Sequence, residues 1–461
     1  MTLQAQSLDD SSGVRARRPI SNLFSLHYFL LRSVTAGGAV VSGLVQTFVF
    51  ARVLTPKDFS IYILIGSFGV ALWLFDLGAA KILFVRQRQR HLTRRTDDAV
   101  PAQSNAIVVL YALIVLTGTL VCFSIMASRP SVTPLQAMEY AAFFSFAGLN
   151  LVWFPLRNVS NAVDEFIVFE ALEVIRRVGH VALMLALLLG LPLLSFLLLA
   201  NLLWFAVFAA CIARLVRKGA LVSRISGCWQ ALAVFWGDNR AEILRSANYG
   251  VGEIAIYNFP YILVPVAFGL GAPTIILDTV FKIFRGATLI YAAGLDPLVP
   301  RQTRAFAEND IATLKKATWA AAILCAVPTV ALCASLLFAG DKFFALLLGH
   351  AATMPRAATL ILVVLLIGNF AHSVASCLLL HTGFFREIAR VASFVVLAMA
   401  AMTAIVVASG MGIVGFIGWY AVVYVAGAGL YVAYAMRRIF LNGPRLAQPI
   451  AANSRLPYDE N

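Results

Sequence analysis

The stretch that decides the fold is a short charged turn between two long apolar runs near the N-terminus. It reads Ala-Arg-Val-Leu-Thr-Pro-Lys-Asp-Phe-Ser-Ile-Tyr at residues 51–62. The run after the turn carries an acid and then a base near its far end, in the sequence Asp-Leu-Gly-Ala-Ala-Lys at residues 76–81. Ionisable residues inside membrane-length runs are costly and commonly mark pathways for ions or substrates. The pattern therefore indicates a membrane protein and favours transport.

The composition agrees with that interpretation. Hydrophobic residues make up 61% of the 461 residues and charged residues only 13%, whereas about a quarter of a soluble globular protein is charged. A bilayer core of about 30 Å needs about 20 apolar residues of helix, and only helices or closed barrels can span it. Because the runs are continuously apolar and not alternating, the sequence predicts an all-α polytopic membrane protein.

Runs of that length recur along almost the whole chain and predict about 12 transmembrane helices. The predicted spans are 28–50, 61–83, 105–127, 135–157, 168–189, 192–213, 249–270, 274–295, 317–338, 357–379, 388–408 and 413–435. The longest interruption divides them six and six, so both halves enter the membrane in the same orientation. This predicts two six-helix lobes related by a pseudo-twofold parallel repeat. The first run is too long for a signal-peptide core and is expected to stay in the mature protein.

The predicted organisation follows directly from these spans. It consists of a cytoplasmic N-terminal tail 1–27, an N-lobe 28–213, a cytoplasmic linker 214–248, a C-lobe 249–435 and a cytoplasmic C-terminal tail 436–461. The loops leave no room for a soluble domain on either face. This excludes an enzyme that merely anchors a catalytic domain in the membrane.

The distribution of Lys and Arg sets the predicted orientation. Of the 36 Lys and Arg residues, the side opposite to the termini holds only Arg52, Lys57, Arg129, Lys342 and Arg356. Since cytoplasmic loops are rich in Lys and Arg, both termini are expected in the cytoplasm. The net charge of +14 is then explained by this topology and by attraction to anionic inner-leaflet lipids, and no nucleic acid partner is expected.

Signatures of soluble enzymes and of bound cofactors are missing from the sequence. The six cysteines lie mostly inside spans and have no Cys-Xaa-Xaa-Cys spacing, so neither a disulfide framework nor a metal site is expected. The chain has no Walker A sequence, no nucleophile elbow and no HExxH motif. We therefore expect no cofactor, no metal and no catalytic residue.

The eighth span holds the strongest candidate site. Asp278, Lys282 and Arg285 stand at i, i+4 and i+7, which places them on one helical face. An intrahelical pair between Asp278 and Lys282 would satisfy both of those residues, but Arg285 would still need an anion. A phosphate suits the planar guanidinium group well. We therefore expect a ligand phosphate at Lys282 and Arg285.

Four other spans carry polar residues whose role is open to interpretation. The small and polar stripes of spans one and two are either packing seams between helices or cavity walls. Span seven carries Glu253 with Pro260 and Pro265, which suits a bendable gate. Span ten carries Asn369 and His372, where a hydrogen-bonded helix contact is favoured over a proton relay.

The opening turn and the Asp-Leu-Gly at residues 76–78 resemble the first hairpin of the polysaccharide (Wzx-type) flippases of the multidrug/oligosaccharidyl-lipid/polysaccharide exporter superfamily. In those proteins an Ala-Arg-Xaa-Leu-Gly turn precedes Phe-Gly-Xaa-Tyr, and Asp-Leu-Gly closes the next helix. This chain has Thr55 and Ser60 where the family usually has glycine, which leaves the exact subfamily open. The twelve-span plan extends the resemblance over essentially the whole chain.

The resemblance implies translocation of an undecaprenyl-diphosphate-linked oligosaccharide or polysaccharide repeat unit across the bacterial inner membrane. It implies alternating access driven by H⁺ or Na⁺, with membrane lipids, a polysaccharide polymerase and export machinery as further partners. A diphosphate needs cations, and the candidate substrate-binding residues are Arg32, Lys81, Arg157, Lys282 and Arg285. Protonation or ion binding changes the cost of a buried carboxylate, and the candidate ion-coupling residues are Asp76, Glu253 and Asp278.

The alternative is a drug or organic-cation antiporter of the same superfamily. An extruder of organic cations needs acids in its cavity, whereas this chain places bases at membrane depth. The lipid II branch typically carries more than twelve spans. A polymerase or glycosyltransferase would need a large periplasmic loop, and no such loop is present in the sequence.

Overall fold

The computed structural model describes residues 22–93, 99–222 and 227–441. Within these ranges it is helical and contains no strand. The helices of the first half are α1 (Asn22–Val53), α2 (Pro56–Ala71), α3 (Ala79–Thr93), α4 (Ala99–Ala127), α5 (Pro134–Ala162), α6 (Phe166–Leu188) and α7 (Leu193–Arg217). Those of the second half are α8 (Cys228–Phe268), α9 (Ala272–Leu295), α10 (Val299–Ala307), α11 (Ile311–Leu348), α12 (Arg356–His381), α13 (Phe385–Ala408) and α14 (Ile413–Ala435).

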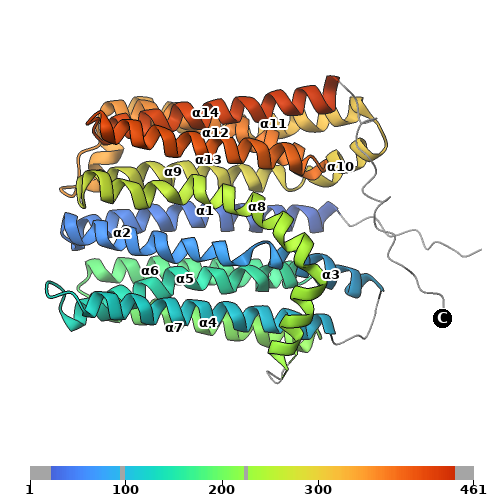
Figure 1. Ribbon diagram of the computed structural model, residues 1–461, viewed down its shortest axis with the longest axis horizontal. Coiled ribbons are helices and arrows are strands. Elements are labelled where there is room, and N and C mark those ends of the chain that lie inside the picture. Colours follow the sequence, from blue (N-terminus) through green and yellow to red (C-terminus); the bar gives the residue numbers. More distant parts are fainter. Residues whose placement is uncertain (1–21, 94–98, 223–226, 442–461) are drawn as a thin grey trace, which may run out of the picture.

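Two lobes of six long helices lie side by side, with the first half in blue to green and the second in yellow to red (Figure 1). Each half has the same order, which is two membrane-length helical segments, one shorter helix (α3 or α10) and four long helices. In the first half the second segment is Pro56–Asp76, which is α2 with the 3₁₀ helix that follows it. This repetition is what a parallel repeat predicts. Nine helices of the described part are long and apolar enough to cross a membrane, and α6, α8 and α9 complete the twelve. The predicted all-α, two-lobe fold is confirmed.

The opening turn is built by helix caps. Helix α1 ends at Val53 and α2 begins at Pro56, so only two residues connect them. The side-chain oxygen of Thr55 accepts a hydrogen bond of 3.2 Å from the backbone N–H of Asp58, and Pro56 occupies the first turn of α2. Both features stabilise a helix start, because Thr55 supplies an acceptor for an N–H group that has none within the helix and proline has no N–H group to satisfy. The sequence thus reverses the chain within a few residues.

The second predicted span, 61–83, is not one continuous helix. Helix α2 ends at Ala71 and is followed by the 3₁₀ helix η1 (Leu72–Asp76). The backbone then turns left-handed at Leu77 (φ 47°) and Gly78 (φ 85°) before α3 begins. A left-handed residue cannot continue a right-handed helix. The membrane-crossing part is therefore Pro56–Asp76, and α3 continues beyond it.

Helix α8 is longer than the predicted seventh span because it begins at Cys228, within residues 214–248. Its first part runs beside the N-lobe and its last part belongs to the C-lobe (Figure 1). Phe235 and Ile243 are buried in the same hydrophobic cluster as Trp153 and Trp204 of the N-lobe. Much of the segment between the lobes is thus a packed helix that joins one lobe to the other.

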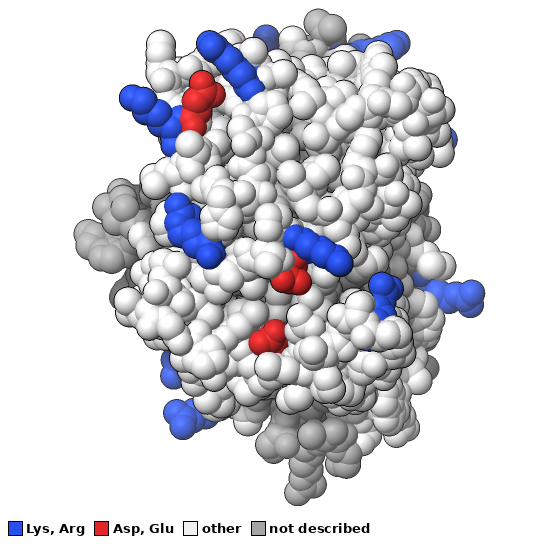
Figure 2. All heavy atoms as spheres, turned by 90° about the vertical axis from the view of Figure 1, so that its left-hand side faces the viewer, with Lys and Arg blue, Asp and Glu red and all other residues white. Residues whose placement is uncertain are grey.

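Both ends of the described chain lie at the same end of the helix bundle (Figure 1). The connections after α1, α4, α6, α8, α11 and α13 lie at the opposite end, which Figure 2 shows face-on. That face is mainly uncharged and carries a few scattered Lys, Arg, Asp and Glu side chains (Figure 2). We call it the outer end and the other the inner end. The side of the membrane that each end faces stays a prediction.

Candidate functional site

Two cavities lie in the helix bundle along α1, α5 and α9. The outer cavity, of about 220 Å³, is lined from the N-lobe by α1, α2 and α5 and from the C-lobe by α8 and α9. The inner cavity, of about 140 Å³, is lined by residues nearer the inner end of α1 together with α5, α6 and Leu289 of α9. Asn150 lines both cavities. They are therefore adjacent compartments.

A close helix contact lies between the two compartments. A Cβ atom added at Gly286 of α9 would lie 3.0 Å from Cγ2 of Val40 on α1. Such a distance is tight for a carbon–carbon contact, so glycine at this position lets the lobes approach closely. Gly286 directly follows Arg285 of the outer cavity and precedes Leu289 of the inner cavity.

In the outer cavity, Asp278 and Lys282 form the intrahelical pair that was the alternative to a ligand at Lys282. The Nζ atom of Lys282 lies 2.6 Å from Oδ2 of Asp278 and donates a hydrogen bond of 2.9 Å to the hydroxyl of Thr47 on α1. The hydroxyl of Tyr261 donates to Oδ1 of Asp278 at 3.1 Å. The Lys282 ammonium therefore links its own lobe to the N-lobe while it neutralises the acid.

Arg285 lies one turn further along the same face and has a different environment. One of its Nη atoms donates to the backbone carbonyl of Tyr257 and, at 3.4 Å, to the side-chain oxygen of Asn258. The guanidinium carbon lies 4.8 Å from the ring centroid of Tyr261, within cation–π range. Its buried Nε atom has no hydrogen-bond partner, and none of the ion pairs between described side chains includes Arg285. The charge of this guanidinium is therefore available to an anion.

The inner cavity contains bases that are already paired. An Nη atom of Arg32 lies 3.4 Å from Oε1 of Glu170, and Nε of Arg32 lies 3.7 Å from Oδ2 of Asp296. Arg157 reaches the same Glu170 oxygen at 3.8 Å. Glu170 belongs to the N-lobe, whereas Asp296 is the C-cap of α9 in the C-lobe. Arg32 therefore bridges the two lobes near the inner end.

Sequence reasoning missed two acids of α6, Glu170 and Glu173. Both line the inner cavity. An oxygen of Glu173 lies 2.5 Å from nitrogens of both Arg176 and Arg177. The available signal was the order Glu-Xaa-Xaa-Glu-Xaa-Xaa-Arg-Arg at residues 170–177, which places acids and bases on one helical face.

Two predicted site residues, Asp76 and Lys81, lie elsewhere, and the side chain of a third is not described. Asp76 caps α3, because its two oxygens accept hydrogen bonds from the backbone N–H groups of Gly78 (3.0 Å) and Ala80 (3.1 Å) and from the hydroxyl of Tyr111 (2.8 Å). Lys81 is exposed on α3. Neither residue lines the outer or the inner cavity. Glu253 belongs to α8, and its side chain lies outside the described part of the structure.

The capping role of Asp76 leads to a first prediction. Asp76→Ala should lower the free energy of unfolding by about 1–2 kcal/mol, as the loss of a helix cap does, while folded protein keeps its transport rate. Thermal unfolding in detergent and transport per folded molecule would measure the two effects. The matched control is Asp58→Ala in the opening turn. Loss of transport by fully folded Asp76→Ala protein would instead support ion coupling at this acid.

Asn369 of α12 forms the hydrogen-bonded helix contact that the sequence favoured. Its amide nitrogen donates to the carbonyl of Phe284 and to the hydroxyl of Thr288, both at 2.9 Å. The hydroxyl of Tyr424 on α14 donates to the Asn369 oxygen at 3.3 Å. The polar residues of this span therefore join α9, α12 and α14 within the C-lobe.

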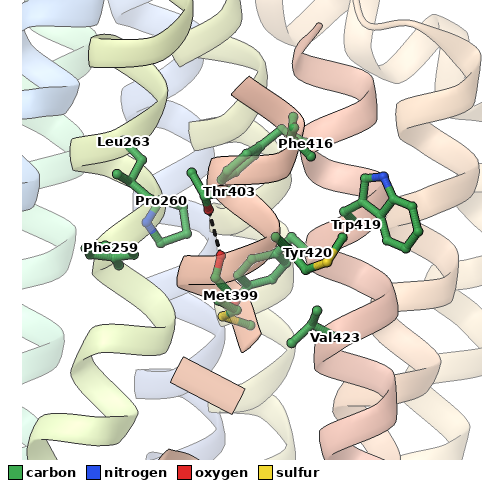
Figure 3. Close-up of a pocket in the computed structure, with 11 residues that line it drawn as sticks. Phe259, Pro260, Leu263, Met399, Thr403, Phe416, Trp419, Tyr420 and Val423 are labelled. Carbon is green, nitrogen blue, oxygen red and sulfur yellow. Dashed lines mark hydrogen bonds between the residues drawn. The ribbon is translucent and has the colours of Figure 1, made fainter. Parts of the chain in front are cut away.

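A third cavity, of about 10 Å³, lies inside the C-lobe (Figure 3). Pro260 of α8 faces Met399 and Thr403 of α13 and Tyr420 of α14, and the Thr403 hydroxyl donates to the Met399 carbonyl at 2.8 Å. The lining contains no charged side chain. It is too small for an organic ligand. It lies beside Pro260, one of the two prolines that interrupt the hydrogen bonds of α8.

A scan against protein-family models finds no match, and a search of curated proteins finds none either. Solved structures do match. The lipid II flippase MurJ, in an inward closed conformation, has a TM-score of 0.61 and 15% sequence identity over 88% of this chain and 87% of that chain. An inward-facing multidrug resistance MATE family transporter of the MOP superfamily has a TM-score of 0.56 and 14% identity, over 89% and 94%.

A MOP superfamily transporter from Pyrococcus furiosus, described by a binding pocket of reverse polarity that suggests a different function, has a TM-score of 0.60 and 11% identity over 89% and 94%. At such identities the likeness concerns the fold. The chain therefore has the fold of MOP superfamily transporters over most of its length.

Proposed function

We propose that this chain translocates an undecaprenyl-diphosphate-linked oligosaccharide or polysaccharide repeat unit across the bacterial inner membrane by ion-coupled alternating access, with both termini in the cytoplasm. The observation that carries the proposal is Arg285, a cation without a carboxylate partner among the described side chains, in a cavity that both lobes line.

The charges of the outer cavity support an anionic substrate. Asp278 neutralises Lys282 at 2.6 Å, which leaves the Arg285 charge uncompensated among the described residues. In a cavity of low dielectric constant, such a charge attracts an anion far more strongly than it would in water. A guanidinium also matches phosphate oxygens with two parallel hydrogen bonds. An organic cation would be repelled, so the charges disfavour the drug antiporter.

The inner cavity supports a first contact with the same headgroup. A diphosphate that approaches Arg32 and Arg157 competes with Glu170, which the two bases contact at 3.4 and 3.8 Å. These distances are long for charge-assisted hydrogen bonds, which typically measure about 2.7–2.9 Å. Since Asn150 lines both cavities, the headgroup would pass from these bases toward Lys282 and Arg285.

Ion coupling is proposed at Asp278. In the structure the carboxylate of Asp278 forms an ion pair with the Lys282 ammonium group. A proton or a Na⁺ ion bound at Asp278 would neutralise the carboxylate and release Lys282 to the substrate phosphate. Substrate binding and ion binding would then favour each other. The lobes would rock about the contact of Val40 with Gly286.

Two of the similar solved structures are proteins of named function, and each supports one of the two candidate functions. MurJ is a lipid II flippase, and its substrate class supports a lipid-linked headgroup for this chain. The MATE family transporter is a multidrug resistance protein and supports the antiporter at the level of the fold. The charges of the two cavities favour the lipid-linked anion.

Purified protein in proteoliposomes tests the proposal with two probes. The first is a fluorescent undecaprenyl-diphosphate-linked disaccharide, whose transbilayer movement is measured by quenching with an impermeant reagent. The second is the lipophilic cation tetraphenylphosphonium, whose flux is measured with an electrode. We expect movement of the lipid-linked disaccharide above that of empty vesicles and no flux of the cation. Flux of the cation alone would identify the antiporter.

A further inference from the structure

Arg52 of the opening turn lines neither cavity, yet its side chain crosses from one lobe to the other. Its Nη2 atom donates a hydrogen bond of 2.6 Å to the carbonyl of Leu346, and its Nη1 atom donates to the carbonyl of Leu347 at 3.5 Å. Arg52 belongs to α1 of the N-lobe, whereas both acceptors belong to α11 of the C-lobe. We propose that Arg52 is the latch that holds the lobes together at the outer end and must release when the outer cavity opens.

The acceptors are suited to a guanidinium group. Helix α11 ends at Leu348, so Leu346 and Leu347 lie in its last turn. The carbonyl groups there have no partner within the helix and form the negative end of the helix dipole. A guanidinium presents several N–H donors in a fixed fork and can bond two neighbouring carbonyls, which an ammonium does less well. The arrangement caps α11 with a side chain from the other lobe.

The position of Arg52 on its own helix is also fixed. Its Nη1 atom donates to the carbonyl of Phe48, one turn earlier, at 2.8 Å. The guanidinium carbon lies 3.5 Å from the centroid of the Phe48 ring, which is a close cation–π contact. These contacts hold the side chain against α1 and direct it toward α11. The bridge is thus a preorganised contact and not a long side chain in solvent.

The latch lies close to the outer cavity along α1. Phe50, two residues before Arg52, lines that cavity. At the inner end, Arg32 and Asp296 form the corresponding bridge between α1 and α9 at 3.7 Å. Alternating access requires the lobes to part at one end at a time. The inference rests on the proposed function only in this requirement, because the contacts themselves need no substrate.

A cysteine reporter measures the opening. Ser67 lines the outer cavity and is 8% exposed, so Ser67→Cys reacts with a membrane-impermeant maleimide only as the outer end opens. We expect Arg52→Ala to raise the labelling rate from the outer side about tenfold, which corresponds to losing about 1.4 kcal/mol of latch energy. Arg52→Lys should give a smaller rise. Labelling of the native cysteines, measured without the reporter, is subtracted.

Two matched variants separate the latch from other effects. Lys57→Ala removes an exposed positive charge from the same turn and should leave the labelling rate unchanged. Asp296→Asn weakens the inner bridge and should not raise labelling from the outer side. Size-exclusion chromatography confirms that each variant is folded. If Arg52→Ala does not fold, Arg52→Lys and Arg52→Gln carry the test.

Unchanged labelling in folded Arg52 variants would overturn the latch, as would an equal rise in Lys57→Ala. Because labelling is measured without substrate, the outcome is independent of the substrate class. A raised rate in a protein that does not move the lipid-linked disaccharide would keep the latch and reject the proposed function.

Discussion

Arg285→Ala should lower the initial rate of transport of the lipid-linked disaccharide at least about 100-fold. Truncating one partner of a buried, hydrogen-bonded charge pair costs about 2–5 kcal/mol, and each 1.4 kcal/mol is about tenfold. Arg285 supplies the uncompensated charge of the outer cavity among the described residues. The measurement is the quenching assay in proteoliposomes, normalised to the amount of folded protein.

Three further variants test whether the expected loss of transport is specific to Arg285. Arg285→Lys keeps the positive charge but loses the planar set of N–H donors, so it should retain part of the transport rate. Lys282→Ala should lower the transport rate less than Arg285→Ala does, because the Lys282 ammonium group is already paired with Asp278. Arg301→Ala on α10 removes an exposed base that lines neither cavity and should leave the rate unchanged. A native rate in folded Arg285→Ala protein would contradict the proposed site.

The two lobes could be predicted because membrane helices need long apolar runs, which hydropathy reveals directly. The break after Asp76 could not, since a 3₁₀ segment and a left-handed Leu77 leave the hydropathy of the run unchanged. The start of α8 at Cys228 was also hidden. Phe235 and Ile243 pack against the N-lobe. The local sequence of this charged segment gives no indication of that tertiary contact.

The site was predictable only where one helix carries it. The spacing of Asp278, Lys282 and Arg285 places them on one face by helix geometry alone, and the structure gathers all three in the outer cavity. The partner of Arg32 is Glu170, which is 138 residues away. Pairing over that distance depends on how the helices pack. Asp76 shows the converse, because a conspicuous acid in an apolar run serves as a cap.

Glu173→Gln should strongly destabilise the N-lobe. Glu173 has a side chain only 6% exposed and contacts both Arg176 and Arg177 at 2.5 Å. Without the carboxylate, two neighbouring guanidinium groups remain buried or half-buried and repel each other. Removing one partner of a buried ion pair typically costs about 3–5 kcal/mol, because it leaves an uncompensated buried charge.

Thermal unfolding in detergent would show this loss as a lowered midpoint, and two variants fix its interpretation. Arg177→Gln leaves Glu173 paired with Arg176 and should cost less than Glu173→Gln. Glu165→Gln removes an acid that is itself 8% exposed but whose partners, Arg214 and Lys218, are 42% and 46% exposed. Because water screens these two bases, its loss should cost less than that of Glu173. An equal midpoint for the Glu173→Gln and Glu165→Gln proteins would mean that water reaches the inner cavity freely. The acids and bases of α6 would then be solvated groups at an open mouth, and the inner cavity would already be accessible from the inner end in the state described here.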